Sequence, residues 1–143
     1  MSLWPPFLGA GVRVKSMSPD FREIEVEMKA RFWNKNYVGS HFGGSLYSMT
    51  DPFYMLMLLE NLGKNYIVWD KSATIRFKKP AYGKVTALFN ISQEELYKIK
   101  SEADANGRSE PNFLVLIKDE QGNIVTEIEK IISVKPKKKI KEK

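Results

Sequence analysis

The chain has no cysteine and only one histidine, His41, among its 143 residues. The absence of cysteine excludes a disulfide framework, a thiolate metal site and a cysteine nucleophile. With a single histidine, there are also too few nitrogen and sulfur ligands for a zinc site, so we expect no bound metal. The lack of cysteine is compatible with a cytoplasmic protein, which is the location we expect.

Long apolar runs are also missing. No segment approaches the roughly 18 apolar residues that span a bilayer, and the N-terminus lacks the basic region and apolar run of a signal peptide. Hydrophobic residues still make up 43% of the chain, which is enough for a core. A chain of this length suits one compact domain.

Positive charge is concentrated at the C-terminal end. The net charge is +6, and residues 135–143, with six lysines and one glutamate, carry +5 of it. We therefore expect a nearly neutral domain over residues 1–134, followed by a basic tail over 135–143. A lysine run of this kind is typical of a solvated, disordered end. The alternative is that it contacts nucleic acid or an anionic membrane surface.

Alternating apolar and polar residues indicate that most of the chain forms β-strands. The last two strands are predicted to form a hairpin, because Gln121-Gly122-Asn123 is a turn signal between them. The expected strands cover residues 11–17, 24–32, 73–77, 85–91, 113–117 and 124–134.

One segment, residues 45–62, has the periodicity of a helix instead. Its apolar residues recur at steps of three and four, and further apolar residues lie off this stripe, so a buried helix is predicted. Gly63 is its expected C-cap. The stripe consists of Leu46, Met49, Phe53, Leu56 and Leu59.

A weaker helical pattern covers residues 92–101, which we expect to lie outside the core as a polar helix or a long loop. Together these elements predict an α+β domain. In it, an antiparallel sheet of five to six strands is wrapped around one long central helix.

The segment before the central helix is rich in glycine and polar residues. A helix N-terminus presents unpaired N–H groups, and Gly43 and Gly44 let a ligand approach the backbone closely. Such N–H groups could stabilise the negative charge that develops on a thioester carbonyl. Asp51 follows seven residues after Gly44 on an otherwise apolar helix, where a carboxylate is costly to bury.

Two interpretations of Asp51 remain open. As a functional group it would be a general base or a nucleophile facing the carbonyl. As a structural group it would cap or hydrogen-bond locally, because Pro52 follows it and the helix could restart there with Asp51 as N-cap. A kink at this point could also aim the acid at a cleft.

These residues resemble the hotdog-fold acyl-CoA thioesterases. The resemblance rests on the order Asn36-x-x-Gly39, the pair Gly43-Gly44 opening a long helix, and the acid Asp51 seven residues later. The run from Ser72 to Val85 resembles the strand and turn that follow the central helix in that family. The resemblance covers residues 12–134. Over residues 34–70 it is nearest to an uncharacterised thioesterase-like subgroup.

The resemblance implies roles for individual residues. The backbone N–H of Gly44 would be the oxyanion donor, Asp51 the base or nucleophile, and Asn36 the residue that braces the loop. His41 departs from the pattern, because the family has histidine directly before the two glycines and Phe42 intervenes here. His41 would then either contact the substrate or hydrogen-bond to the loop backbone. The resemblance to His-Phe-Pro-Gly dehydratases is weaker, since this loop has no proline.

Three basic residues follow the central helix on the next strand: Arg76, Lys78 and Lys79. They would bind the phosphates of coenzyme A, or they form a solvated strand face. Tyr66 and Trp69 are expected in the core or at a dimer seam.

The predicted function is hydrolysis of an acyl-CoA thioester, with no cofactor apart from the coenzyme A of the substrate. The alternative is a non-catalytic acyl-CoA or lipid-binding protein on the same fold. A sheet with exposed edges around so apolar a helix favours a homodimer or a dimer of dimers. In such a dimer, Asp51 of one chain would face the loop 36–44 of the other.

Overall fold

A computed structural model describes residues 2–138, which form one six-stranded antiparallel sheet with the order β1-β2-β4-β5-β6-β3. The strands are β1 (Val12–Met17), β2 (Glu23–Lys29), β3 (Tyr66–Phe77), β4 (Lys84–Asn90), β5 (Asn112–Lys118) and β6 (Ile124–Pro136). The helices are α1 (Pro5–Ala10), α2 (Gly43–Ser48), α3 (Phe53–Leu62) and α4 (Gln93–Asn106).

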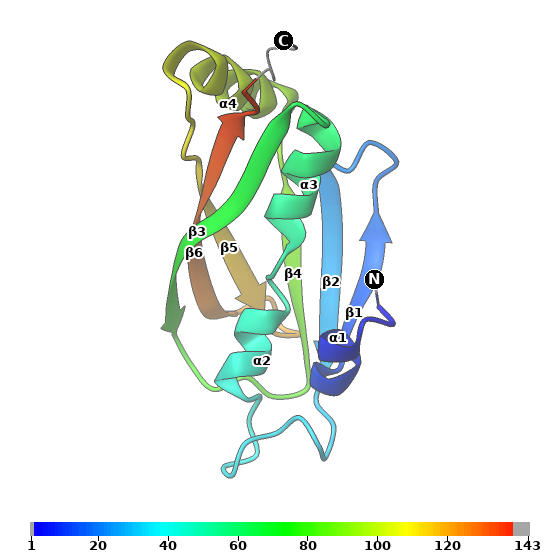
Figure 1. Ribbon diagram of the computed structural model, residues 1–143. Helices are drawn as coiled ribbons and strands as arrows, with labels where there is room; N and C mark the ends of the chain where they lie inside the picture. The colour runs from blue at the N-terminus through cyan, green and yellow to red at the C-terminus, as the bar shows by residue number, and fades with distance from the viewer. Residues whose placement is uncertain (1, 139–143) are drawn as a thin grey trace.

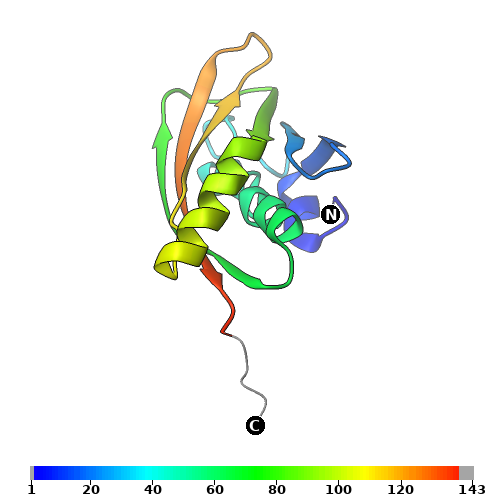
Figure 2. The ribbon, with the colours of Figure 1, turned by 90° about the horizontal axis from the view of Figure 1, so that it is seen from above.

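The sheet curves around the central helical segment, which consists of α2 and α3 (Figures 1 and 2). Its inner face carries the apolar residues of the alternating strands, and Val26, Val115 and Ile128 are fully buried there. The α+β hotdog fold predicted from the sequence is therefore confirmed. None of the helices within residues 2–138 is long and apolar enough to cross a membrane.

The central helix is interrupted. Residues 49–52 form turns between α2 and α3, and the peptide bond between Asp51 and Pro52 is cis. Because of this interruption, the buried face of α3 does not continue the apolar stripe predicted for an unbroken helix. The structure buries Met57 and Leu58 fully, whereas Leu56 and Leu59 of the predicted stripe are only partly buried. Gly63 caps α3 as expected, and its N–H donates to the Leu59 carbonyl.

Three strand boundaries differ from the sequence prediction. The strand predicted over 73–77 begins already at Tyr66. The strand predicted over 24–32 ends at Lys29, and Phe32 lies in the following loop with its side chain 89% exposed. At the other end, β6 continues through Lys135 and Pro136, beyond the expected domain boundary at 134. Residues 139–143 of the predicted tail lie outside the described part of the chain. The short helix α1 was not expected from the sequence.

The prediction that residues 92–101 lie outside the core was wrong. The helix α4 extends to Asn106 and buries Leu96, Ile99 and Ala103, which recur at helical spacing on one face. Its start is well defined, because Ser92 and Glu95 form a reciprocal capping box.

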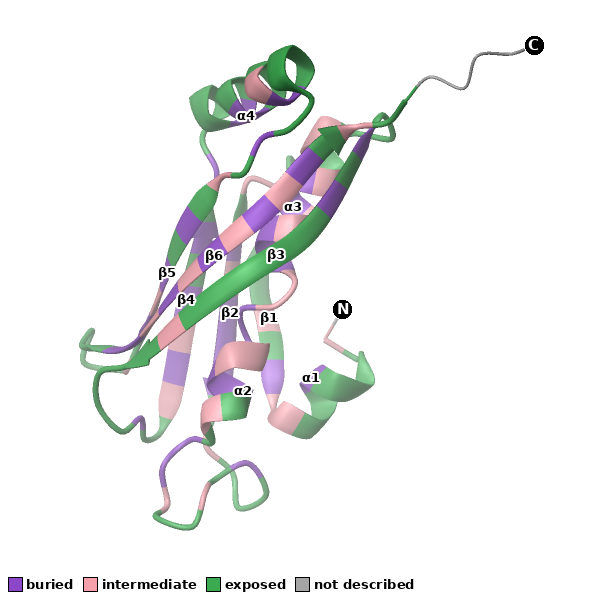
Figure 3. Ribbon diagram, turned by 60° about the vertical axis from the view of Figure 1, so that its left-hand side comes forward, coloured by how far each residue is buried: buried purple, intermediate pink, exposed green. Residues whose placement is uncertain are grey.

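The strand β3 forms one edge of the sheet, paired with β6 on one side only. It is exposed along most of its length, whereas β6 alternates between buried and partly buried residues (Figure 3). Trp69 on β3 is 66% exposed, and Tyr66 at its start is buried. An unpaired edge of twelve residues is a surface on which another strand can add.

Candidate active site

The loop before α2 is held by its two asparagines. Asn34 is buried and links the Arg31 N–H to the carbonyls of Ala10 and Lys29. Asn36 closes a tight turn, since its side-chain oxygen accepts from the N–H of Ser40 at 3.1 Å and its amide donates to the Ser40 hydroxyl at 2.8 Å. Asn36 therefore has contacts of the bracing kind that the family resemblance implies.

His41 is bound to the backbone of the loop that connects β3 and β4. Its ring Nε2 lies 2.7 Å from the Gly83 carbonyl oxygen, and its backbone N–H donates to the Ala81 carbonyl at 2.8 Å. Since a carbonyl can only accept, Nε2 is the donor in this contact. Nδ1 is buried without a hydrogen-bond partner within residues 2–138. The His41 residue thus connects the loop before α2 to the loop between β3 and β4 by hydrogen bonds.

The α2 helix opens with Gly43 and Gly44 directly after Phe42, its N-cap residue. The amides of Ser45 and Leu46 bond back to the Phe42 carbonyl, which leaves those of Gly43 and Gly44 as the unpaired donors expected in a first turn. Both glycines are in close contact with aromatic rings. A Cβ on Gly43 would lie 3.0 Å from the Phe77 ring, and one on Gly44 would lie 2.6 Å from the Phe42 ring.

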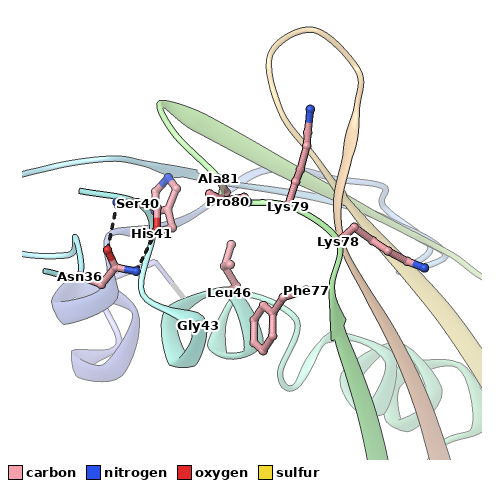
Figure 4. A pocket seen from close by; sticks show the side chains of 10 residues that line it. All are labelled: Asn36, Ser40, His41, Gly43, Leu46, Phe77, Lys78, Lys79, Pro80 and Ala81. Carbon is pink, nitrogen blue, oxygen red and sulfur yellow. Dashed lines mark hydrogen bonds between the residues drawn. The ribbon is translucent and has the colours of Figure 1, made fainter. Parts of the chain in front are cut away.

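An open cavity of about 370 Å³ lies between this loop and the end of β3 (Figure 4). Its floor is apolar and includes Leu46 and Phe77. Lys78 and Lys79 stand at its rim, with the two side chains pointing in different directions. The cavity is lined by Asn36, Ser40, His41, Gly43, Leu46, Phe77, Lys78, Lys79, Pro80 and Ala81.

The three predicted basic residues are not equivalent. Lys78 forms an ion pair with Glu127 at 3.5 Å, and Lys79 one with Asp119 at 3.2 Å. Both lysine side chains remain nearly half exposed, so these pairs are weak surface contacts that an anion could replace. Arg76 is exposed on β3 and does not line the cavity.

Asp51 lies elsewhere on the same chain. It follows α2 and is absent from the lining of the cavity that contains Gly43. Asp51 does not cap α3, whose N-cap is Pro52 without a side-chain hydrogen bond. Gly44 is also absent from the lining of this cavity, so of the glycine pair and the acid only Gly43 faces it.

The carboxylate of Asp51 instead faces a buried lysine. Lys130 Nζ lies 3.5 Å from Asp51 Oδ1 and 3.4 Å from Asp70 Oδ1, and the lysine side chain is fully buried. The side chains of Asp51 and Asp70 are 45% and 28% exposed. The ammonium also lies 5.8 Å from the centroid of the Tyr47 ring. We call Asp51, Asp70 and Lys130 the acid–lysine cluster.

Neither Lys130 nor Asp70 was predicted as a site residue. A signal for Lys130 exists in the sequence, because it occupies the inward phase of β6 between Ile128 and Ile132. A lysine at such a position needs a buried anionic partner. The sequence around Asp70 carries no comparable signal, since β3 is an exposed strand with several charged residues.

Asp70 has the perturbed carboxyl of this cluster. Partial burial raises its pKa, a hydrogen bond with Asp51 raises it further, and the Lys130 ammonium acts in the opposite direction. The net direction is upward, so Asp70 retains its proton to higher pH than an ordinary aspartate. Nowhere in residues 2–138 do three acidic or histidine side chains gather as a metal site.

The chain belongs to the family described as a domain of unknown function, DUF4442, whose profile matches residues 1–134. No curated protein sequence matches the chain significantly.

Solved structures share its fold. A Pseudomonas aeruginosa protein of unknown function, described as a "Probable Thioesterase", is similar at 22% identity with a TM-score of 0.80, over 92% of this chain and 87% of that one. A Haemophilus influenzae thioesterase is similar at 15% identity with a TM-score of 0.68, over 94% of this chain and 85% of that one. A Chlorobaculum tepidum protein of unknown function is similar at 14% identity with a TM-score of 0.76, over 95% of this chain and 89% of that one.

Proposed function

We propose that the protein is an acyl-CoA thioesterase in which Asp51 is the general base or nucleophile and the Gly44 N–H is the oxyanion donor. The observation that carries the proposal is the Asp51 carboxylate, which is accessible to solvent while a fully buried ammonium stabilises its charge. Similar folds with descriptions as thioesterases support the class of reaction.

The chemistry needs only a base and an oxyanion site. Asp51 removes a proton from water while the water oxygen attacks the thioester carbonyl, and the Gly44 N–H stabilises the negative oxygen that forms. The carbon–sulfur bond then breaks, and the proton passes to the sulfur. In the nucleophilic variant, the Asp51 oxygen attacks first and water then hydrolyses the anhydride. The products are a carboxylic acid and coenzyme A, and no further cofactor takes part.

The cavity beside α2 suits one end of such a substrate. Its apolar floor and basic rim match a thioester chain that continues into a phosphorylated carrier. We place Lys78 and Lys79, which directly follow β3, at the phosphates of coenzyme A, with Arg76 on β3 outside the lining of the cavity. Asn36 and His41 hold the cavity wall in place.

A second subunit would complete the site. Within residues 2–138, Asp51 does not line the cavity that contains Gly43, and β3, which carries Asp70, is an edge strand of the sheet. We propose a homodimer, alone or as a dimer of dimers, in which Asp51 of one subunit faces the glycine loop of the other. A cytoplasmic location fits the lack of cysteine.

The alternative function is acyl-CoA binding without turnover. One observation favours it. Nε2 of His41 is hydrogen-bonded to the Gly83 carbonyl and Nδ1 is buried, so neither ring nitrogen can accept a proton from a substrate. A protein of this kind would use the same cavity.

A thiol-release screen tests the proposal. Short, long and aromatic acyl-CoAs are incubated with the wild type, with Asp51→Ala and with Glu60→Gln, which removes an exposed acid from α3. We expect Asp51→Ala to lose about 10²- to 10⁴-fold in turnover and the control to retain it. Full activity of Asp51→Ala would reject the catalytic assignment. Binding of acyl-CoA without thiol release by the wild type would favour the alternative.

A further inference from the structure

The acid–lysine cluster joins three elements of the fold. Lys130 comes from β6, Asp70 from the edge strand β3, and Asp51 from the turn between α2 and α3. The centroid of the Tyr47 ring on α2 lies 5.8 Å from the Lys130 ammonium. Lys130 is inaccessible to solvent, whereas both carboxylates are partly open to it. A substrate could therefore reach the acids but not the lysine.

Charge balance restricts the protonation of this cluster. If both acids were ionised, two negative charges in hydrogen-bonding contact would repel each other. If both were neutral, the ammonium of Lys130 would be buried without a counter-ion, which is strongly unfavourable. The buried ammonium therefore needs at least one ionised aspartate beside it.

The two acids differ in exposure. The Asp70 side chain is the less exposed of the two, and its burial raises its pKa. Lys130 donates to Asp51, and its ammonium also lies within ion-pair distance of Asp70, so the buried cation holds both side chains in place.

We infer that Asp70 and Lys130 are positioning residues that act as a unit to hold the Asp51 carboxylate in place, with the buried ammonium in contact with both aspartates. The catalytic consequence of this inference rests on the proposed function, but the arrangement of the three side chains does not. Lys130 of β6 and Asp70 of β3 face Asp51, and the Tyr47 ring of α2 faces the Lys130 ammonium.

The test is a carbon-13 NMR titration of the aspartate carboxyls in the wild type, Lys130→Met, Asp70→Asn and Lys71→Met. Methionine fills a similar volume without the charge. Lys71 is one residue from Asp70, half exposed and paired with Glu110, so its variant is the matched control. We expect Lys130→Met to raise the pKa of Asp70 further, because the ammonium that opposes the upward shift is lost, and Lys71→Met to leave it unchanged.

Asp70→Asn provides the second variant. An asparagine amide can donate to Asp51, so the cluster should persist while the Asp70 carboxyl disappears from the spectrum. An unchanged Asp70 titration in Lys130→Met, or a carboxyl with a raised pKa that survives in Asp70→Asn, would overturn the inference.

Thiol release separates this inference from the proposed function. If the wild type is active, the acidic limb of the kcat pH profile should move to higher pH in Lys130→Met, with KM little changed and recovery in Lys130→Arg. A profile that does not move would overturn the inference and leave the thioesterase proposal intact. If the wild type releases no thiol, the proposed function fails and the NMR titration alone decides.

Discussion

The Nζ atom of Lys130 lies 3.5 Å from Oδ1 of Asp51, and the Lys130 side chain has no exposed surface. The two residues are 79 positions apart in the sequence, and their contact links the end of α2 to the inner face of β6. A buried cation beneath a half-exposed carboxylate stabilises the charged form of that carboxylate. This relationship distinguishes Asp51 from an ordinary surface acid.

The oxyanion assignment can be tested at Gly44 by comparing two substitutions. Gly44→Pro removes the N–H, and proline is tolerated in the first turn of a helix. Gly44→Ala keeps the N–H but adds the Cβ that would meet the Phe42 ring, so it controls for the steric change. We expect the proline variant to lose about 10²- to 10³-fold in kcat relative to the alanine variant. Equal kcat values would exclude the Gly44 amide as the donor.

The outline of the fold was predictable because most strands alternate between apolar and polar residues and several turns carry glycine or proline signals. The Gly122 turn between β5 and β6 and the Gly63 cap are local features, and both were found where expected. The buried face of α3 was not predictable in the same way. A stripe drawn through residues 45–62 assumes an unbroken helix, and the turns at 49–52 shift it.

The candidate site was predictable only in part, because its components come from separate elements. Asp51 and the glycine pair are close in sequence, so one motif contains both. The partners of Asp51 lie on β3 and β6, and their approach depends on the β3–β6 pairing at the sheet edge. A lysine in the inward phase of β6 indicates a buried charge, but it does not reveal which acids meet it.

Burial of Lys130 makes a prediction for stability. Lys130→Ala should lower the free energy of unfolding by about 2 to 5 kcal/mol, because it removes both the cation and the volume that its side chain fills. Lys130→Met should be less destabilising, since only the charge is lost. Urea denaturation measures both variants, and equal losses would mean that packing at this position contributes little.

A role of His41 in holding the loop predicts a selective effect on binding. His41→Ala removes the contact with the Gly83 carbonyl, so the loop before α2 should be less well held and KM for acyl-CoA should rise. His41→Gln, whose amide can donate to the same carbonyl, should restore KM. The kcat pH profile should stay unchanged in both variants. Loss of a titrating limb would instead show that the imidazole transfers protons during turnover.

The phenol of Tyr66 makes stability depend on pH in the alkaline range. Its O–H donates to the Asp104 carboxylate at 2.7 Å, and this bond raises the pKa of Tyr66 to about 12 from its ordinary 10.0. The folded state therefore keeps a proton that the unfolded chain has lost, so stability should fall as the pH rises from about 10 to 12. Unfolding of Tyr66→Phe should lack this slope, and Tyr97→Phe, an exposed site on α4, should retain it.

Subunit mixing tests whether the site is shared across a dimer. Asp51→Ala and Gly44→Pro each inactivate one half of a composite site, so each variant alone should be inactive. In a mixed dimer, the Asp51 of the Gly44→Pro subunit faces the intact loop of the other subunit, which restores one site. Random exchange of equal amounts should therefore restore about a quarter of wild-type activity. Light scattering must show the same dimeric or tetrameric mass throughout. No recovery after proven exchange would place Asp51 and Gly44 of each site on the same subunit, contrary to the proposed seam.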